Sequence, residues 1–96
     1  PSVMAWSVGN EIGDYPTTMK YVEAATAYVR TLDSTRLAAA VSNTADRSPD
    51  FIQFSDIGLI NKYNKNLGPV TDLQHKLHPE KILFYSEYGI GQIGEN

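Results

Sequence analysis

The 96-residue sequence contains no cysteine, no long apolar run and no excess of basic residues. The absence of cysteine excludes disulfide bonds and thiolate metal sites, but it does not identify the cellular compartment. No apolar run approaches the ~18 residues that a membrane-spanning helix needs, so we expect no membrane partner. The formal net charge of -3 gives no basic surface for nucleic acid, so we expect no nucleic-acid partner either.

The composition is nevertheless that of a folded protein, because 42% of the residues are hydrophobic and can form a core. A strand-like apolar stretch begins at Val3, and another ends only a few residues before Asn96. Natural domains usually begin and end in exposed segments. We therefore expect residues 1–96 to be a fragment of a longer chain.

Four short apolar stretches predict buried β-strands. They are Val3–Val8, Leu37–Val41, Ile57–Tyr63 and Ile82–Glu87. The first of them is nearly continuous in apolar character, which suits a strand that is covered on both faces. The second is rich in alanine and could be a helix by composition, but its short length favours a strand.

Longer stretches between these strands predict helices. Thr17–Leu32 repeats apolar side chains every three or four residues, with Thr17 or Thr18 as its N-cap. A Gly68-Pro69 break precedes a second helix at Val70–Leu77. Strands that alternate with helices or turns are typical of βα units on a parallel sheet, which is an α/β fold.

Polar residues follow three of the predicted strands. They are Asn10 and Glu11 after the first strand, Asn61 and Tyr63 at the end of the third, and Glu87 at the end of the fourth. In an α/β barrel, the carboxyl ends of the strands carry the active site. These side chains therefore share the topological position at which catalysis occurs in such folds.

Two glutamates at these positions suggest one kind of chemistry. A single glutamate at a strand end is most often a solvated charge, but Glu11 and Glu87 each follow a strand of the same apolar character. A retaining glycosidase needs a nucleophilic carboxylate and an acid/base carboxyl group about 5 to 5.5 Å apart. A parallel barrel brings strands that are distant in sequence to one rim, so the separation along the chain is no obstacle.

Other polar clusters have simpler interpretations. Asp72, His75 and His78 could share a metal ion, but no further ligand is evident and a solvated helix face is the better interpretation. The polar residues 44–50 could contact a substrate, although a plain surface loop is the simpler account, followed by a helical turn at Asp50–Phe54. We expect no metal site and no cofactor.

Two motifs resemble glycoside hydrolase family 2, which includes β-galactosidases, β-glucuronidases and β-mannosidases. Trp6-Ser7-Val8-Gly9-Asn10-Glu11 resembles the acid/base strand of this family, and Ser86-Glu87-Tyr88-Gly89 resembles its nucleophile strand. The segment ending in Asn61-Lys62-Tyr63 resembles the sixth barrel strand, and Leu32-Asp33-Ser34-Thr35-Arg36 resembles the turn before the fifth. The resemblance covers essentially the whole chain.

This resemblance implies a partial TIM (β/α)8 barrel that holds about strands 4 to 7. It implies that Glu11 is the general acid/base and Glu87 the nucleophile, that Asn10 binds the sugar 2-hydroxyl and that Tyr63 orients the nucleophile. The implied activity is that of a retaining exo-β-glycosidase acting on a carbohydrate. A β-galactosidase is slightly favoured, with β-glucuronidase or β-mannosidase as the alternative.

A partial barrel has consequences for the isolated chain. A complete barrel takes about 250 residues, so four strands leave two open edges, and open edges recruit partners. We expect the chain either to self-associate or to pair with the missing remainder of the barrel. A second hypothesis is that these residues by themselves are a catalytically inactive structural fragment.

Overall fold

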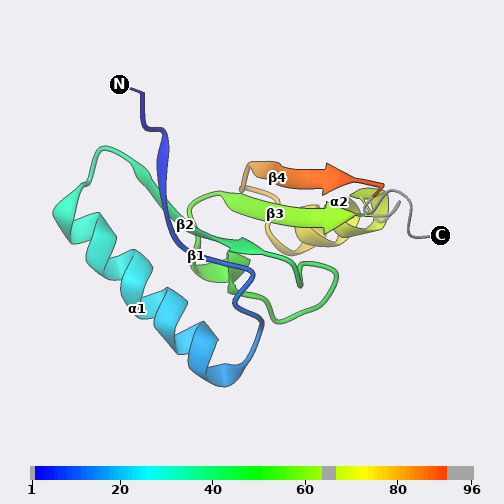
Figure 1. Cartoon of the computed structure of the whole chain (residues 1–96), viewed down its shortest axis with the longest axis horizontal. Coiled ribbons are helices and arrows are strands. Elements are labelled where there is room, and N and C mark those ends of the chain that lie inside the picture. Colours follow the sequence, from blue (N-terminus) through cyan, green and yellow to red (C-terminus); the bar gives the residue numbers. More distant parts are fainter. Residues whose placement is uncertain (1, 64–66, 91–96) are drawn as a thin grey trace.

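The computed structural model describes residues 2–63 and 67–90 and contains one parallel sheet of four strands. The strands are β1 (Ala5–Asn10), β2 (Leu37–Ser42), β3 (Gly58–Tyr63) and β4 (Leu83–Gly89). Each strand pairs with the next one along the chain, so β1 and β4 form the two edges (Figure 1). This arrangement is the parallel α/β sheet that the sequence predicts.

Helical segments connect the strands. The helix α1 (Pro16–Leu32) joins β1 to β2, the short 3-10 helix η1 (Phe51–Phe54) precedes β3, and α2 (Leu67–Leu77) joins β3 to β4. Figure 1 shows α1 beside β1 and β2, and α2 behind β3 and β4. No helix within residues 2–63 and 67–90 has the length and apolar character to cross a membrane.

Both helices cover the same face of the sheet. Val22 of α1 packs with Ala40 of β2, and Val70 of α2 packs with Ile60 of β3. Ala40 and Ile60 point to the same side, because Ser42 pairs with Ile60 and side chains alternate along a strand. A third cluster, formed by Ala39, Val41, Ile57 and Leu59, lies on the opposite face, here called the inner face.

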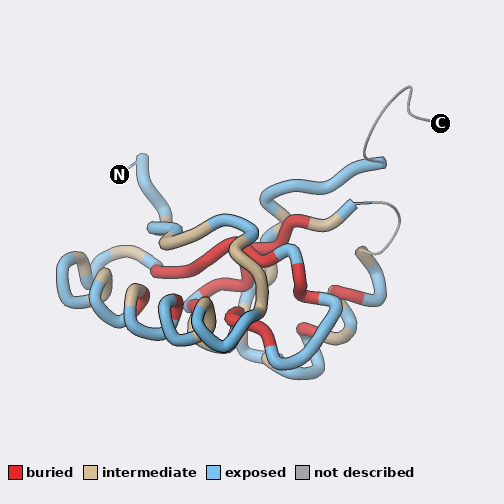
Figure 2. Tube along the Cα trace, turned by 60° about the horizontal axis from the view of Figure 1, so that its bottom comes forward, coloured by how far each residue is buried: buried red, intermediate tan, exposed pale blue. Residues whose placement is uncertain are grey.

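The core is centred on β2 and β3, whereas the edge strands are exposed (Figure 2). Ala38, Ala39 and Ala40 are fully buried, since strands flank β2 on both sides and small side chains allow close packing. Coverage on both faces is wrong for the first strand, where Trp6 is 42% exposed. The physical reason is position, because β1 has one neighbouring strand and an open inner face.

Some predicted boundaries are wrong. β1 begins at Ala5 rather than Val3, because β2 begins at its partner Leu37. α1 begins at Pro16 after the N-cap Tyr15, which makes no side-chain cap. Proline suits the first helical position because its missing N–H needs no partner there.

The start of the second helix also differs from the prediction. α2 already begins at Leu67, so Gly68 and Pro69 lie in its first turn instead of preceding it. Proline is tolerated there, since the first N–H groups of a helix have no intrahelical acceptor. The α2 helix therefore incorporates residues whose composition indicated a break.

Candidate active site

Each of the two strands that lead to the glutamates contains one extra residue relative to its neighbour. Between Ser7 and Asn10, β1 takes three residue steps while the paired segment of β2 takes two. Between Tyr85 and Glu87, β4 takes two steps while the paired segment of β3 takes one. Such bulges interrupt the alternation of side chains between the two faces. They redirect Asn10 and Glu87 toward the inner face.

The buried side chain of Asn61 is the point at which these groups meet. Its Nδ2 donates to Oε1 of Glu11 at 2.9 Å and to Oε1 of Glu87 at 2.9 Å. It also lies 3.2 Å from Oδ1 of Asn10. The two carboxylate oxygens are therefore at most about 5.8 Å apart, twice the 2.9 Å contact.

Tyr63 completes the cluster. Its hydroxyl donates to the second oxygen of Glu87, Oε2, at 2.5 Å. This hydrogen bond to Glu87 raises the pKa of Tyr63 above its usual value, and burial and the charges of Glu87 and Glu11 act in the same direction. Tyr63 therefore stays protonated at neutral pH and remains a donor. The structure thus brings together all four residues that the sequence singled out: Asn10, Glu11, Tyr63 and Glu87.

Glu11 has a left-handed backbone, with φ at 54°. Residues with a Cβ adopt this conformation at a cost of about 1 to 2 kcal/mol, and such strain clusters at functional sites. The N–H of Glu11 donates to the carbonyl of Val41 at 2.9 Å, which holds the residue against β2. The backbone at the end of β1 is therefore held in a conformation that regular strand geometry does not provide.

The sequence named Asn61 as a polar strand end without a role, and it gave no role to Ser86. Asn61 is 1% exposed, and Ser86 Oγ donates to its Oδ1 at 2.6 Å. The available signal was an amide directly after the apolar run Ile57–Ile60, because a buried polar group requires partners. Ser86 belongs to the motif Ser86-Glu87-Tyr88-Gly89, but the sequence does not predict its contact with Asn61, since that contact depends on the bulge in β4.

The polar loop before η1 is a surface loop at residues 46–49, as the sequence predicted, but its end at Asp50 is buried. Asp50 is 5% exposed and accepts hydrogen bonds from the hydroxyls of Ser42 and Thr44 and from the N–H of Ile52. The carboxylate thus caps η1 and closes the loop. Its burial is possible because hydrogen-bond donors surround both oxygens.

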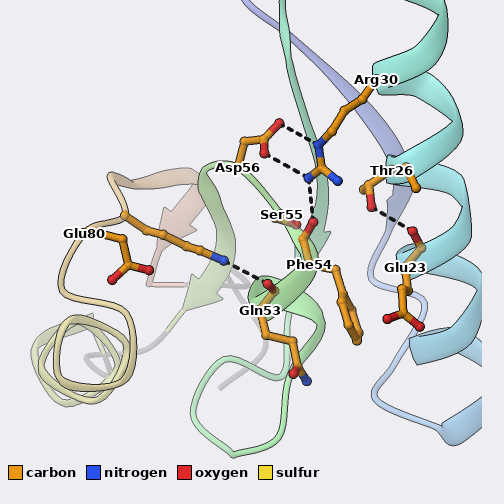
Figure 3. A pocket seen from close by; sticks show the side chains of 10 residues that line it. Glu23, Thr26, Arg30, Gln53, Phe54, Ser55, Asp56 and Glu80 are labelled. Carbon is orange, nitrogen blue, oxygen red and sulfur yellow. Dashed lines mark hydrogen bonds and ion pairs between the residues drawn. The ribbon is translucent and has the colours of Figure 1, made fainter. Parts of the chain in front are cut away.

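A hollow of about 580 Å³ lies at the opposite ends of the strands from the glutamates. Figure 3 shows Arg30 of α1 reaching across it to Asp56 and to the carbonyl of Phe54. Lys81 donates to the carbonyls of Ile52 and Gln53. The charged groups here bind one another and the backbone, so the hollow has a structural explanation.

Metal-binding geometry is absent from the residues that the structure describes. Within them, no three histidine, aspartate or glutamate side chains lie close enough to share an ion. The side chains at the carboxyl ends of the strands include two carboxylates that accept hydrogen bonds from the same amide nitrogen of Asn61. Such a pair can perform nucleophilic and acid/base chemistry.

Comparison with known proteins gives the family. The family model "Glycosyl hydrolases family 2, TIM barrel domain" matches residues 1–95. A curated β-glucuronidase of Bacteroides fragilis is 34% identical over 101 residues, which cover 95% of this chain and 14% of the relative. The chain therefore spans about one seventh of the length of that protein.

Solved structures agree in fold. A crystal structure of a candidate β-galactosidase from Bacteroides fragilis matches with a TM-score of 0.73 and 21% identity, covering 92% of this chain and 14% of that one. An FMN-binding β-glucuronidase from Facaelibacterium prausnitzii L2-6 matches with a TM-score of 0.72 and 28% identity, and the match covers 97% of this chain and 16% of that one. The chain belongs to glycosyl hydrolase family 2, and its four strands are part of that family's TIM barrel domain.

Proposed function

We propose that this chain carries both catalytic carboxylates of a retaining exo-β-glycosidase. The observation that supports this most strongly is the contact of Glu11 and Glu87 with the same amide nitrogen, Nδ2 of Asn61. Their oxygens are then at most about 5.8 Å apart, twice 2.9 Å. Retaining enzymes have carboxyl groups about 5 to 5.5 Å apart, whereas inverting enzymes need about 6.5 to 9.5 Å.

The hydrogen bonds support a division of roles between the two carboxylates. Glu87 accepts one hydrogen bond at each oxygen, from Asn61 and from Tyr63, which fixes the orientation of the carboxylate as a nucleophile requires. Glu11 accepts the bond from Asn61 at Oε1, and no described residue donates to its other oxygen. That oxygen is suited to exchange a proton with the substrate, as a general acid/base must.

The reaction then proceeds in two displacements. In the first, a Glu87 oxygen bonds to the anomeric carbon while the glycosidic bond breaks and Glu11 gives its proton to the departing oxygen. In the second, Glu11 removes a proton from water, whose oxygen bonds to the anomeric carbon and releases Glu87. Asn10 is placed to donate to the sugar 2-hydroxyl through its amide, since its Oδ1 faces Asn61.

The relatives favour a β-glucuronide over a β-galactoside as the substrate. The proteins at 34% and 28% identity are both β-glucuronidases, whereas the candidate β-galactosidase at 21% identity supports the fold alone. This order reverses the slight preference for β-galactosidase that the motifs gave. β-Mannoside remains the third alternative.

The decisive experiment replaces the nucleophile in the full-length protein of which we expect this segment to be part. Glu87→Gln keeps the size of the side chain but removes its charge, so turnover of nitrophenyl β-glucuronide, β-galactoside and β-mannoside should fall at least about 10⁴-fold. Initial rates with the three substrates also identify the sugar.

A matched control is Glu80→Gln, the same chemical change at an exposed residue at the opposite end of the sheet. It should retain the rate of the unaltered protein. Unchanged turnover in Glu87→Gln would refute the proposed function. The 96-residue chain alone should be inactive, because the missing strands would supply most contacts with the sugar.

A further inference from the structure

We propose that Asn61 and Ser86 act together as positioning residues that hold the carboxylates of Glu11 and Glu87 at the separation and orientation that the reaction needs. This inference rests on the proposed function and extends it to two residues without an assigned role. Asn61 comes from β3 and lies between Glu11, which follows β1, and Glu87 of β4. One side chain thus connects two strands that are not neighbours in the sheet.

The chemistry of an amide fixes the orientation of Asn61. Its Nδ2 group has two hydrogens, and the two shortest contacts of that nitrogen are the carboxylate oxygens of Glu11 and Glu87, each at 2.9 Å. If the amide were turned over, its carbonyl oxygen would face the ionised carboxylate of Glu87 with no proton between the two oxygens. The amide nitrogen must therefore point toward the glutamates for the pair to be held.

Ser86 selects this orientation. Its hydroxyl donates to Oδ1 of Asn61 at 2.6 Å, and a hydroxyl can supply the proton that a carbonyl oxygen needs. Its alternative acceptor, the carbonyl of Ile60, is more distant at 3.4 Å. With Oδ1 occupied in this way, the amide presents its nitrogen to the carboxylates.

The bulge in β4 makes this arrangement possible. In a regular strand, consecutive residues point to opposite faces, so Ser86 and Glu87 could not both contact one inner-face side chain. The extra residue between Tyr85 and Glu87 breaks that alternation. As a result, both reach Asn61, Ser86 at its oxygen and Glu87 at its nitrogen.

The test uses the full-length protein with two substrate types. Aryl glycosides with an acidic leaving group, such as dinitrophenyl, need no proton from the acid/base residue in the first displacement, whereas alkyl glycosides do. Both substrate types need that residue as a base in the second displacement. If Asn61 orients both carboxylates, Asn61→Ala should lower kcat on the dinitrophenyl substrate roughly 100-fold, and should lower it further on the alkyl substrate. KM should change little by comparison.

Ser86 provides the second variant, in case Asn61→Ala does not fold. Ser86→Ala should lower kcat about 10-fold on the dinitrophenyl substrate and more on the alkyl one, since the amide is then free to turn over. Ser86→Thr keeps the hydroxyl and should restore most of the rate. Asn61→Asp should be at least as damaging as alanine, because it places a third carboxylate beside the other two.

The control is Tyr85→Phe, which removes a hydroxyl from the adjacent residue on the helix-covered face, where it contacts Thr71 and the carbonyl of Leu67. It should leave both rates unchanged. Rates in Asn61→Ala and Ser86→Ala equal to those of Tyr85→Phe would overturn the inference, as would an equal loss on both substrate types. The variant Glu87→Gln separates failure of this inference from failure of the proposed function. If Glu87→Gln remains active, the proposed function is wrong; if it is inactive, the rates of the Asn61 and Ser86 variants decide the inference.

Discussion

Among the described residues, the hydroxyl of Tyr63 is one of two donors to Glu87, and removing it measures what that contact contributes. Tyr63→Phe removes a hydrogen bond to a charged group, which contributes about 1.5 to 3 kcal/mol. We expect kcat of the full-length protein to fall about 10- to 100-fold. The pKa of Tyr63 is raised above its usual value of 10.0, so its ionisation should not shape the alkaline side of the pH–rate profile. That side should therefore be the same in Tyr63→Phe as in the unaltered protein.

A matched control for this change is Tyr21→Phe. The hydroxyl of Tyr21 donates to the backbone carbonyl of Val8 at 2.7 Å, so the same substitution removes a tyrosine hydrogen bond to a neutral acceptor without contact to either glutamate. Steady-state kinetics of the two variants separate the effects. Equal rates in both would show that Tyr63 has no part in orienting Glu87.

The sequence predicts the role of some residues of the candidate site and not of others. Glu11 and Glu87 were found because a carboxylate that follows an apolar strand stands out. Their common partner, Asn61, was missed in this role because its importance lies in two contacts with distant strands. Ser86 is part of the nucleophile motif, but its role was not predictable, since the side of the strand that it faces depends on a bulge.

At the scale of elements, the turn between α1 and β2 connects three parts of the fold through one carboxylate. Asp33 accepts hydrogen bonds from the hydroxyl and N–H of Thr35, from the indole of Trp6 in β1 and from Arg36. The bonds from Thr35 and Trp6, followed by that from Arg36, lower the pKa of Asp33 far below its usual range. The turn thus ties the start of β1 to the end of α1.

The pKa of Asp33 predicts an acid sensitivity. A carboxyl group with a lowered folded-state pKa stabilises the fold above its unfolded value of about 3.9, and this contribution is lost as the pH falls toward the folded value. Asp33→Asn should therefore lower the urea midpoint at about pH 7, and the difference from the original protein should shrink toward about pH 3.

Asp72→Asn is the control for the acid experiment, since Asp72 is an exposed carboxylate on α2. It should follow the original protein at both pH values. A constant difference between Asp33→Asn and the original protein across the whole range would contradict the prediction. In that case the contribution of the turn would not depend on the charge of Asp33.

Secondary structure was more predictable than its irregularities. All four strands and both helices were expected from apolar periodicity, which reflects burial of one face or both. The predicted N-cap of α1 and the predicted start of α2 were wrong, because a proline in the first turn of a helix looks, in the sequence, like a residue that precedes the helix. The two bulges have no sequence signature, because they arise from pairing with a neighbouring strand.

At the scale of the whole molecule, the inner face and both sheet edges are open. Met4, Ile82, Phe84 and Tyr88 are all between 49% and 70% exposed, an unusual concentration of large apolar side chains for a free surface. β1 and β4 each have one neighbouring strand, so their outer edges offer unpaired backbone groups. We propose that the isolated 96-residue chain self-associates through these surfaces.

Sedimentation velocity at micromolar concentration tests this proposal and should show dimers or larger species. Phe84→Lys places a charge on the inner face, where Phe84 neighbours Leu59, and should shift the distribution toward monomer. Tyr28→Lys, at an exposed position on α1, should not do so. A well-folded monomer of the unaltered chain would rule the proposal out.

The left-handed backbone of Glu11 has a consequence for how this position evolves. Glycine adopts a φ of 54° without the steric cost that a Cβ brings, so folding and catalysis favour different residues at this position. Under the proposed function, a lineage that no longer needs the activity loses the pressure that catalysis places on glutamate at this position, while the pressure for stability persists. Descendants that have lost the activity should therefore drift toward glycine or asparagine at position 11, and this residue records whether catalysis is still under selection.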